Sequence, residues 1–254
     1  MKLYKKSFLL GTLAFALCMT GGCDDNINLE PEGIITADGF FKSAEDYEKA
    51  LNSLYDRLNI DNLDLWMDGV TDNGLVTHSW NRGYDIGRGI GNSASSFPAD
   101  KWDKGYVSVQ QANNIINNID KYSWPAGEND ATRNKVLGEA RTLRAYFYLD
   151  LLSIFGHIMF YTENPATIAE SSEVKQVMDP KEVFDFILDD LDKAIAGLPD
   201  RSVNKSKIGK AAARLLRARA AAYAAGYLND KSYFQIVLDE TSHLIASAPK
   251  LADF

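Results

Sequence analysis

One stretch, residues 138–156 (GEARTLRAYFYLDLLSIFG), limits the possible folds more than any other. Its apolar side chains cover nearly the whole circumference of a helix, and a helix of that kind is normally buried among other helices. Arg141, Arg144 and Asp150 interrupt the stretch, so it lacks the ~20 largely apolar residues of a membrane span. No proline breaks it, and its glycines stand only at its ends. We therefore predict the central helix of an all-α fold, with further helices packed on several sides.

Further helices are predicted along the chain, and two of them share a short repeat. Residues 140–145 (ARTLRA) match residues 213–218 (ARLLRA) at an offset of 73 (213 minus 140), which is roughly two helical hairpins of ~34 residues. Such an offset favours a tetratricopeptide-like helical repeat scaffold. Capping and spacing signals predict helices over residues 43–58, 102–120, 130–156, 180–197, 206–228 and 232–248, with caps at Ser43, Asp179, Ser206 and Ser232.

Between about residues 59 and 101 the helical pattern gives way to glycine, asparagine, aspartate and serine. Loops of this length are uncommon in compact domains and often carry function. A sugar site needs exposed aromatic rings for the apolar C–H faces of a sugar and polar side chains for its hydroxyls. The loop contains such a group, which makes it the candidate ligand site: Trp80, Asn81, Arg82, Tyr84 and Asp85, with Trp66 nearby.

An alternative interpretation is that the aromatic residues of the loop anchor it to the helices. We favour anchoring for Trp66 and for Trp102, which stands at the exit of the loop. For Trp80 and Tyr84, which lie among glycines and polar residues, both interpretations stay open.

The rest of the chain shows no pattern typical of catalysis, metal binding or nucleic-acid binding. A formal net charge of −8 disfavours nucleic acid, which needs a basic surface. No cysteine follows Cys23, which excludes a cysteine-based zinc site or thiol nucleophile beyond it, and the three histidines lack metal-ligand spacing. The aspartates within residues 185–192 are interpreted as a solvated helix face. We predict no catalytic residue, no metal and no cofactor.

The N-terminus has the features of a bacterial lipoprotein signal. Residues 1–22 contain a basic start and a short apolar run, and Thr20-Gly21-Gly22 then precedes Cys23, the predicted lipidation site. Two or more acyl chains would anchor the chain stably to a membrane. An ordinary secretory signal that happens to contain cysteine is the alternative. The predicted organisation is thus a signal peptide over 1–22, a lipidated tether over 23–38 and a helical domain over 39–254.

These features together resemble the SusD/RagB family, the nutrient-binding outer-membrane lipoproteins of Bacteroidetes. The resemblance rests on motifs spread over the chain: Gly39-Phe40-Phe41, Ala112-Asn113-Asn114, Glu139-Ala140-Arg141, Phe155-Gly156, Asp190-Leu191-Asp192 and the residues 210–222. It implies a tetratricopeptide-type scaffold on a lipid anchor in the outer membrane. It also implies that the protein is not an enzyme and presents an oligosaccharide or other nutrient to a SusC-like TonB-dependent transporter. Acidic residues after the lipidated cysteine, here Asp24 and Asp25, are associated in such families with exposure at the cell surface.

Members of that family are about twice as long, so the resemblance implies that the C-terminal half of the family fold is missing here. We therefore expect apolar surface that the other half would cover. Two further functions stay open as alternatives. One is a tetratricopeptide-type scaffold that binds a protein partner. The other is a glycoside hydrolase, which would need two carboxyl groups ~5–9.5 Å apart in a cleft.

Overall fold

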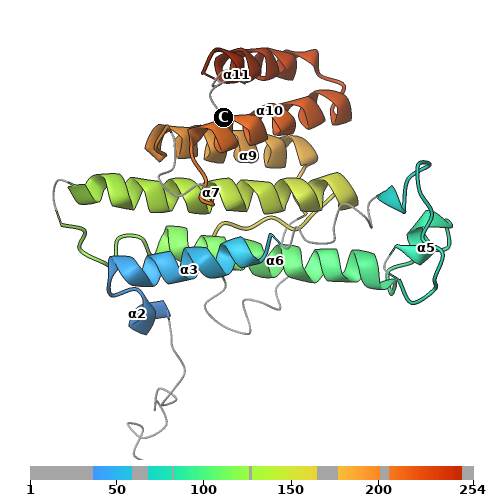
Figure 1. The fold of residues 1–254 in the computed structure, drawn as a ribbon, viewed down its shortest axis with the longest axis horizontal. Helices are drawn as coiled ribbons and strands as arrows, with labels where there is room; N and C mark the ends of the chain where they lie inside the picture. Colours follow the sequence, from blue (N-terminus) through green and yellow to red (C-terminus); the bar gives the residue numbers. More distant parts are fainter. Residues whose placement is uncertain are drawn as a thin grey trace, which may run out of the picture. The chain divides into compact units, whose positions relative to one another are not determined.

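The computed structural model describes residues 37–58, 68–81, 83–125, 128–164, 177–200 and 206–247. In these ranges no strand forms, and the one β-type pairing is an isolated bridge between Met159 and Val177. The helices, in chain order, are α2 (Ala37–Phe40), α3 (Ala44–Asp56), α5 (Tyr84–Gly87), α6 (Ser96–Asn117), α7 (Glu128–Phe155), α9 (Pro180–Gly197), α10 (Lys210–Tyr227), the 3-10 helix η3 (Lys231–Tyr233) and α11 (Phe234–Ser247) (Figure 1). The predicted all-α, tetratricopeptide-like fold is confirmed.

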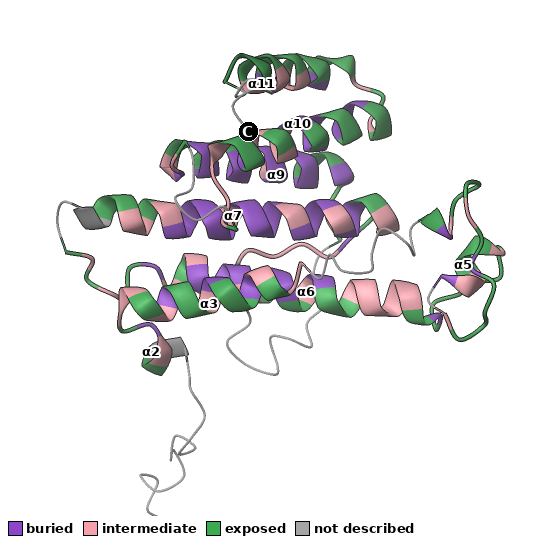
Figure 2. Cartoon of the chain, viewed as in Figure 1, coloured by how far each residue is buried: buried purple, intermediate pink, exposed green. Residues whose placement is uncertain are grey.

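Helix α7 occupies the centre of this arrangement. It packs against α3 and α6 and also against α9 and α10. Its side chains are buried on several faces, with Leu143, Tyr148, Leu151 and Leu152 at 1% exposure or less (Figure 2). The prediction of a central helix covered on several sides is confirmed.

Beyond α7 the helices follow one another as a stack, with α9 on α7, α10 on α9 and α11 on α10. Small residues allow close approach between neighbours. A Cβ atom added at Gly138 of α7 would lie 2.6 Å from Cγ of Leu198, just beyond α9, so that contact has no room for a side chain. Ala213, Ala220 and Ala224 of α10 are fully buried, as expected for an alanine-rich helix in an inner layer.

A buried ion pair joins α7 to α9. Arg144 donates through Nε to Oδ2 of Asp190 at 2.7 Å and through Nη2 to Oδ1 at 2.8 Å. Its Nη1 donates to Oδ1 of Asn113 on α6 at 2.8 Å. The interpretation of residues 185–192 as a solvated acidic face is therefore wrong for Asp190, which is 2% exposed. The reason is its helical position, because it follows Ile187 by three residues and shares the face that packs on α7.

A second pair of arginines holds a buried carboxylate between α10 and α11. Arg214 and Arg217 each donate through Nη1 to Glu240 at 2.6 Å, and Glu240 is 4% exposed. These arginines occupy the places of Arg141 and Arg144 in the sequence repeat. Nε of Arg141 also lies 3.8 Å from Oδ1 of Asp190. In both copies of the repeat, an arginine pair on one long helix therefore holds an acidic residue on the next long helix.

A buried carboxyl also connects three elements. The hydroxyl of Tyr55 on α3 donates to Oε2 of Glu139 on α7 at 2.7 Å, and its oxygen accepts the backbone N–H of Ile208 at 2.8 Å. Burial raises the pKa of the Glu139 carboxyl above its ordinary value, although the hydrogen bond from Tyr55 and the charge of Lys135 act in the opposite direction. The junction fixes the segment before α10 against α3 and α7.

Two predicted caps are confirmed. The side chain of Ser43 accepts from the N–H of Asp46 at the start of α3, and that of Asp179 accepts from the N–H of Lys181 at the start of α9.

Several predicted boundaries were wrong. Helix α6 begins at Ser96, not at residue 102, since Pro98 is tolerated in a first helical turn. Helix α10 begins at Lys210 behind Gly209, not at residue 206. Asp230 caps η3, so α11 starts at Phe234 instead of following a cap at Ser232.

Apolar side chains remain exposed on α10 and α11, among them Leu215, Leu238 and Ile245. We expected apolar surface that the other half of the family fold would cover. That this surface exceeds the few hundred Å² usual for a monomer stays a prediction. No helix in the described ranges is long and apolar enough to cross a membrane. The predicted signal peptide, Cys23 and nearly all of the tether lie outside the described residues.

Candidate functional site

The candidate site lies on the segment of residues 68–95, which leads into α6 and includes the short helix α5 (Figure 1). Two glycines shape it. Gly83, which precedes α5, has a φ of 82°, a left-handed conformation that favours glycine. A Cβ atom at Gly87 would lie 2.7 Å from the carbonyl oxygen of Gly69, so α5 ends in close contact with the start of the segment.

Trp80 is the most prominent side chain of the segment. It is 78% exposed, which is unusual for a residue of this size. The imidazole of His78 stacks on it, with ring centroids 4.4 Å apart and an interplanar angle of 9°. Since one face of the indole is covered by this stacking, the other face is the one available to a flat apolar ligand surface.

Asn81 follows Trp80, and hydrogen bonds of the Asn81 backbone fix its position. Its N–H donates to the carbonyl of His78 at 3.0 Å, and its own carbonyl accepts the N–H of Tyr84 at 3.3 Å. Its side-chain amide has no hydrogen-bond partner among the residues that the structure describes. The amide therefore remains available, on the residue that follows the exposed Trp80, to donate to and accept from ligand hydroxyls.

Tyr84 and Asp85 have structural partners instead. The guanidinium of Arg88 lies 3.8 Å from the ring centroid of Tyr84, and its Nη1 donates to the carbonyl of Val76 at 2.5 Å. Asp85 accepts from the hydroxyl of Ser95, the residue that precedes α6, at 3.1 Å. These contacts tie the segment to itself and to α6, which favours the anchoring interpretation for Tyr84 and gives Asp85 a structural partner as well.

The remaining predicted residues divide into two groups. Trp66 and Arg82 lie outside the described residues. Trp102 packs edge-on against Tyr106 and Phe155, with ring centroids 4.8 and 5.0 Å apart. Trp102 lies within α6, so it packs α6 against α7 and does not anchor the loop as predicted.

His78 is a residue that the sequence interpretation missed. It was considered only as a metal ligand and was set aside for lack of spacing. No spacing rule pointed to it, because its ring reaches Trp80 through the turn that the hydrogen bond from the Asn81 N–H to the His78 carbonyl closes.

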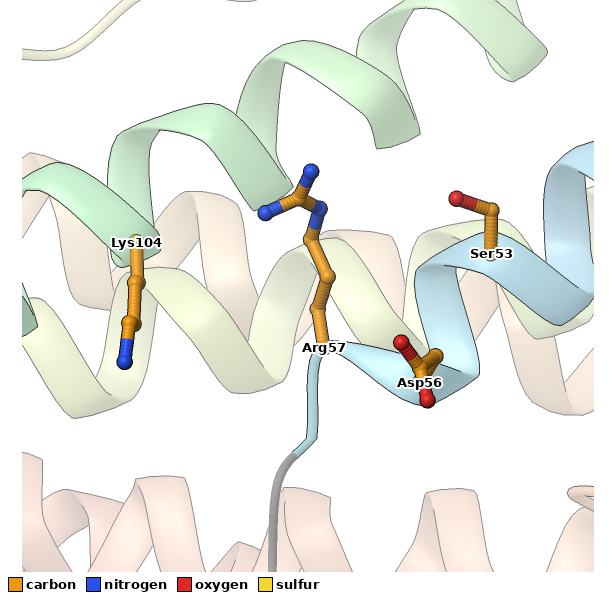
Figure 3. Close-up of a pocket in the computed structure, with 4 residues that line it drawn as sticks. All are labelled: Ser53, Asp56, Arg57 and Lys104. Atoms are coloured by element: carbon orange, nitrogen blue, oxygen red, sulfur yellow. The ribbon is translucent and has the colours of Figure 1, made fainter.

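A separate pocket of about 230 Å³ lies between the end of α3 and α6 (Figure 3). The pocket is lined by Ser53, Asp56, Arg57 and Lys104, which are all polar or charged. None of the predicted site residues contributes to this lining. Arg57 extends toward α6, where Nε donates to Oε1 of Gln111 at 2.7 Å. Because all four lining residues are polar or charged, the pocket lacks the mostly apolar lining typical of small-molecule sites.

The described residues contain no group of three histidine, cysteine, aspartate or glutamate side chains that could hold a metal ion. The segment presents one exposed ring pair, His78 and Trp80, and the side-chain amide of Asn81.

Comparison with known proteins places these observations in a family context. Residues 38–223 match the model of a SusD-like family described as "Starch-binding associating with outer membrane". A SusD-like protein of Bacteroides ovatus is 26% identical over 216 residues, which cover 80% of this chain and 37% of that protein.

Solved structures show the same fold. The crystal structure of a SusD-like protein from Bacteroides fragilis superposes with a TM-score of 0.69 at 22% identity, covering 85% of this chain and 41% of that one. A laminarin-binding SusD-like protein gives a TM-score of 0.66 at 21% identity, covering 78% of this chain and 44% of the other. The chain spans less than half the length of the curated relatives it matches, from 34% to 46%.

Proposed function

The chain belongs to the SusD-like family, described as starch-binding and associating with the outer membrane, and from this premise we propose that it is a cell-surface glycan-binding lipoprotein in nutrient uptake. The family description names binding and no reaction, which supports a protein without chemistry of its own. The observation that carries the proposal is the exposed indole of Trp80, backed by His78 and followed by the free amide of Asn81.

We assign unequal roles to the six predicted site residues. Trp80 supplies the stacking surface and Asn81 the hydrogen bonds. Tyr84 and Asp85 hold the segment that presents them, through Arg88 and Ser95. Trp66 and Arg82 stay predicted contributors.

Replacing Trp80 by alanine is expected to weaken glycan binding by about tenfold, or ~1.4 kcal/mol, because it removes the exposed indole from the ring pair. Affinity electrophoresis of the full chain in native gels containing starch or laminarin measures the change. Tyr223→Ala removes an aromatic residue of α10 that is 43% exposed and serves as the matched control. Equal retardation of wild type and Trp80→Ala in a gel that retards the wild type would contradict the assignment.

The proposal includes a lipid anchor at Cys23 and a SusC-like TonB-dependent transporter as partner. Cells fed radiolabelled palmitate are expected to label the wild-type chain and to leave Cys23→Ala unlabelled and outside the outer-membrane fraction. Label on Cys23→Ala at the wild-type level would rule out that anchor. Affinity purification from detergent-solubilised outer membranes is expected to recover the transporter with the wild-type chain, and its absence would remove the transporter from the proposal.

A further inference from the structure

The polar pocket between the end of α3 and α6 carries more hydrogen-bonding capacity than the fold uses (Figure 3). The side chains of Ser53 and Asp56 have no hydrogen-bond or ion-pair partner in the part of the chain that the structure describes. Lys104 has only a long ion pair, with 3.8 Å between Nζ and Oδ2 of Asp100, and its side chain is 51% exposed. A ligand can therefore engage these groups at little cost to the fold.

The guanidinium of Arg57 is held in place in this pocket. Arg57 caps the C-terminus of α3 and extends toward α6, where Nε donates to Oε1 of Gln111 at 2.7 Å (Figure 3). This bond leaves both Nη groups without a partner among the described residues, and the adjacent carboxylate of Asp56 forms no ion pair with them there. The edge formed by the two Nη groups of a guanidinium can donate two parallel hydrogen bonds to a carboxylate.

The charges of the pocket are divided between its two sides. The two cations lie toward α6, since Arg57 reaches that helix and Lys104 belongs to it. Ser53 and Asp56 belong to the last turn of α3, whose C-terminal end adds partial negative charge. An anionic group is therefore favoured on the α6 side, and hydroxyl donors are favoured on the α3 side. Two cations and one anion give the lining a net charge of +1, in a chain of net −8.

We propose that this pocket binds one uronate unit, a sugar ring that carries a single carboxylate. The carboxylate is held by Arg57 and Lys104, and ring hydroxyls donate to Asp56 and exchange hydrogen bonds with Ser53. The net +1 of the lining matches a monoanion, whereas Asp56 disfavours a dianion such as phosphate. A volume of about 230 Å³ lies below the ~300–1,000 Å³ of pockets for drug-sized ligands, which suits a single small unit.

This site is independent of the ring pair of His78 and Trp80. The two share no residue, and their tests use different ligands, because starch and laminarin carry no carboxylate. A failure of the Trp80 assignment therefore leaves the uronate site standing, and a failure of the uronate site leaves the Trp80 assignment standing.

Titration of the purified full chain with D-glucuronate, followed by saturation-transfer difference NMR, tests the proposal. Binding is expected in the millimolar range, as is usual for a small ligand in an open, hydrated pocket. D-glucose has the same ring without the carboxylate and is expected to bind about tenfold more weakly, because it lacks the charge-assisted hydrogen bonds.

Two variants remove one cation each from the pocket. Lys104→Gln is expected to weaken glucuronate binding about threefold, as for an exposed ion pair. Arg57→Gln is expected to weaken it about tenfold, and circular dichroism checks its fold, because the substitution also removes the bond to Gln111. Lys193→Gln on α9 is the matched control with unchanged binding, since Lys193 is 55% exposed and likewise pairs with an aspartate one turn away.

Four outcomes would overturn the proposal. Absence of saturation transfer from glucuronate well above the millimolar range would remove the site. Equal binding of glucose, or stronger binding of the cationic sugar glucosamine, would show that the two cations do not select the ligand. An equal loss in Lys193→Gln would indicate a general effect of net charge. Displacement of glucuronate by an equal concentration of inorganic sulfate would reduce the pocket to a simple anion site.

Discussion

Asp190→Ala is expected to lower the free energy of unfolding by about 3–5 kcal/mol, since it leaves the Arg144 guanidinium buried between α7 and α9 without its carboxylate. Both side chains of the pair are at most 6% exposed, so water cannot replace the lost partner without opening the interface. Most single substitutions cost far less, and such a value identifies a disrupted buried network. Urea denaturation followed by circular dichroism measures the change.

Asp189→Ala is the matched control for this prediction. It removes a carboxylate one residue away on the same helix, paired with Lys193 at the surface, where both side chains are 55% exposed. Exposed pairs of this kind contribute ~0–1 kcal/mol. Similar losses for the two variants would show that the buried pair has no special weight. Replacing Arg144 and Asp190 together by Met and Leu is expected to recover much of the stability, because no unpaired charge then remains.

Glu240→Ala is expected to destabilise the chain by about 3 kcal/mol, because one carboxylate serves both Arg214 and Arg217. The Nε atoms of these arginines are buried and already lack a hydrogen-bond partner in the described residues, so the loss of Glu240 would also leave their Nη1 groups without this acceptor. The arginines are 20–23% exposed, which places the expected loss at the lower end of the range for buried pairs.

Thermal unfolding followed by circular dichroism tests the prediction for Glu240, with Asp239→Ala as control. Asp239 is exposed and accepts a hydrogen bond from Gln235 one turn away. Its removal is expected to change the stability by less than ~0.5 kcal/mol. A Glu240→Ala variant as stable as Asp239→Ala would mean that α11 is held by apolar contacts alone.

The sequence predicted the fold well where the pattern was strong. The apolar circumference of residues 138–156 could only belong to a buried helix, and the caps at Ser43 and Asp179 formed as expected. The start of α6 was missed because glycine, serine and proline around Ser96 are weak local signals that tertiary packing overrides. The burial of Asp190 was missed because the aspartates were assigned to the solvated face by residue type, although Asp190 follows Ile187 by three residues. Its partner Arg144, which stands 46 residues away, could not be predicted from the sequence.

The sequence predicted where the candidate site lies. It did not predict which of its residues are exposed to a ligand and which hold the segment in place. Trp80 and Tyr84 lie in the same local composition, and only the three-dimensional contact of Arg88 with Tyr84 separates an exposed ring from an anchored one. For the same reason His78 was overlooked, since its role depends on stacking and not on charge. Composition identifies which residue types are present, whereas exposure depends on the packing of the whole segment.

The unequal coverage of the helices has a consequence for how the chain opens. In a stack whose members touch mainly their neighbours, the cost of local opening is set by the number of contacts that must break. Detaching α11 breaks its contacts with α10 and η3, whereas releasing α7 breaks contacts with α3, α6, α9 and α10 at once. Local unfolding is therefore expected to begin at α11. The free energy of opening is expected to be highest at α7, which can unfold only together with the helices that pack on it.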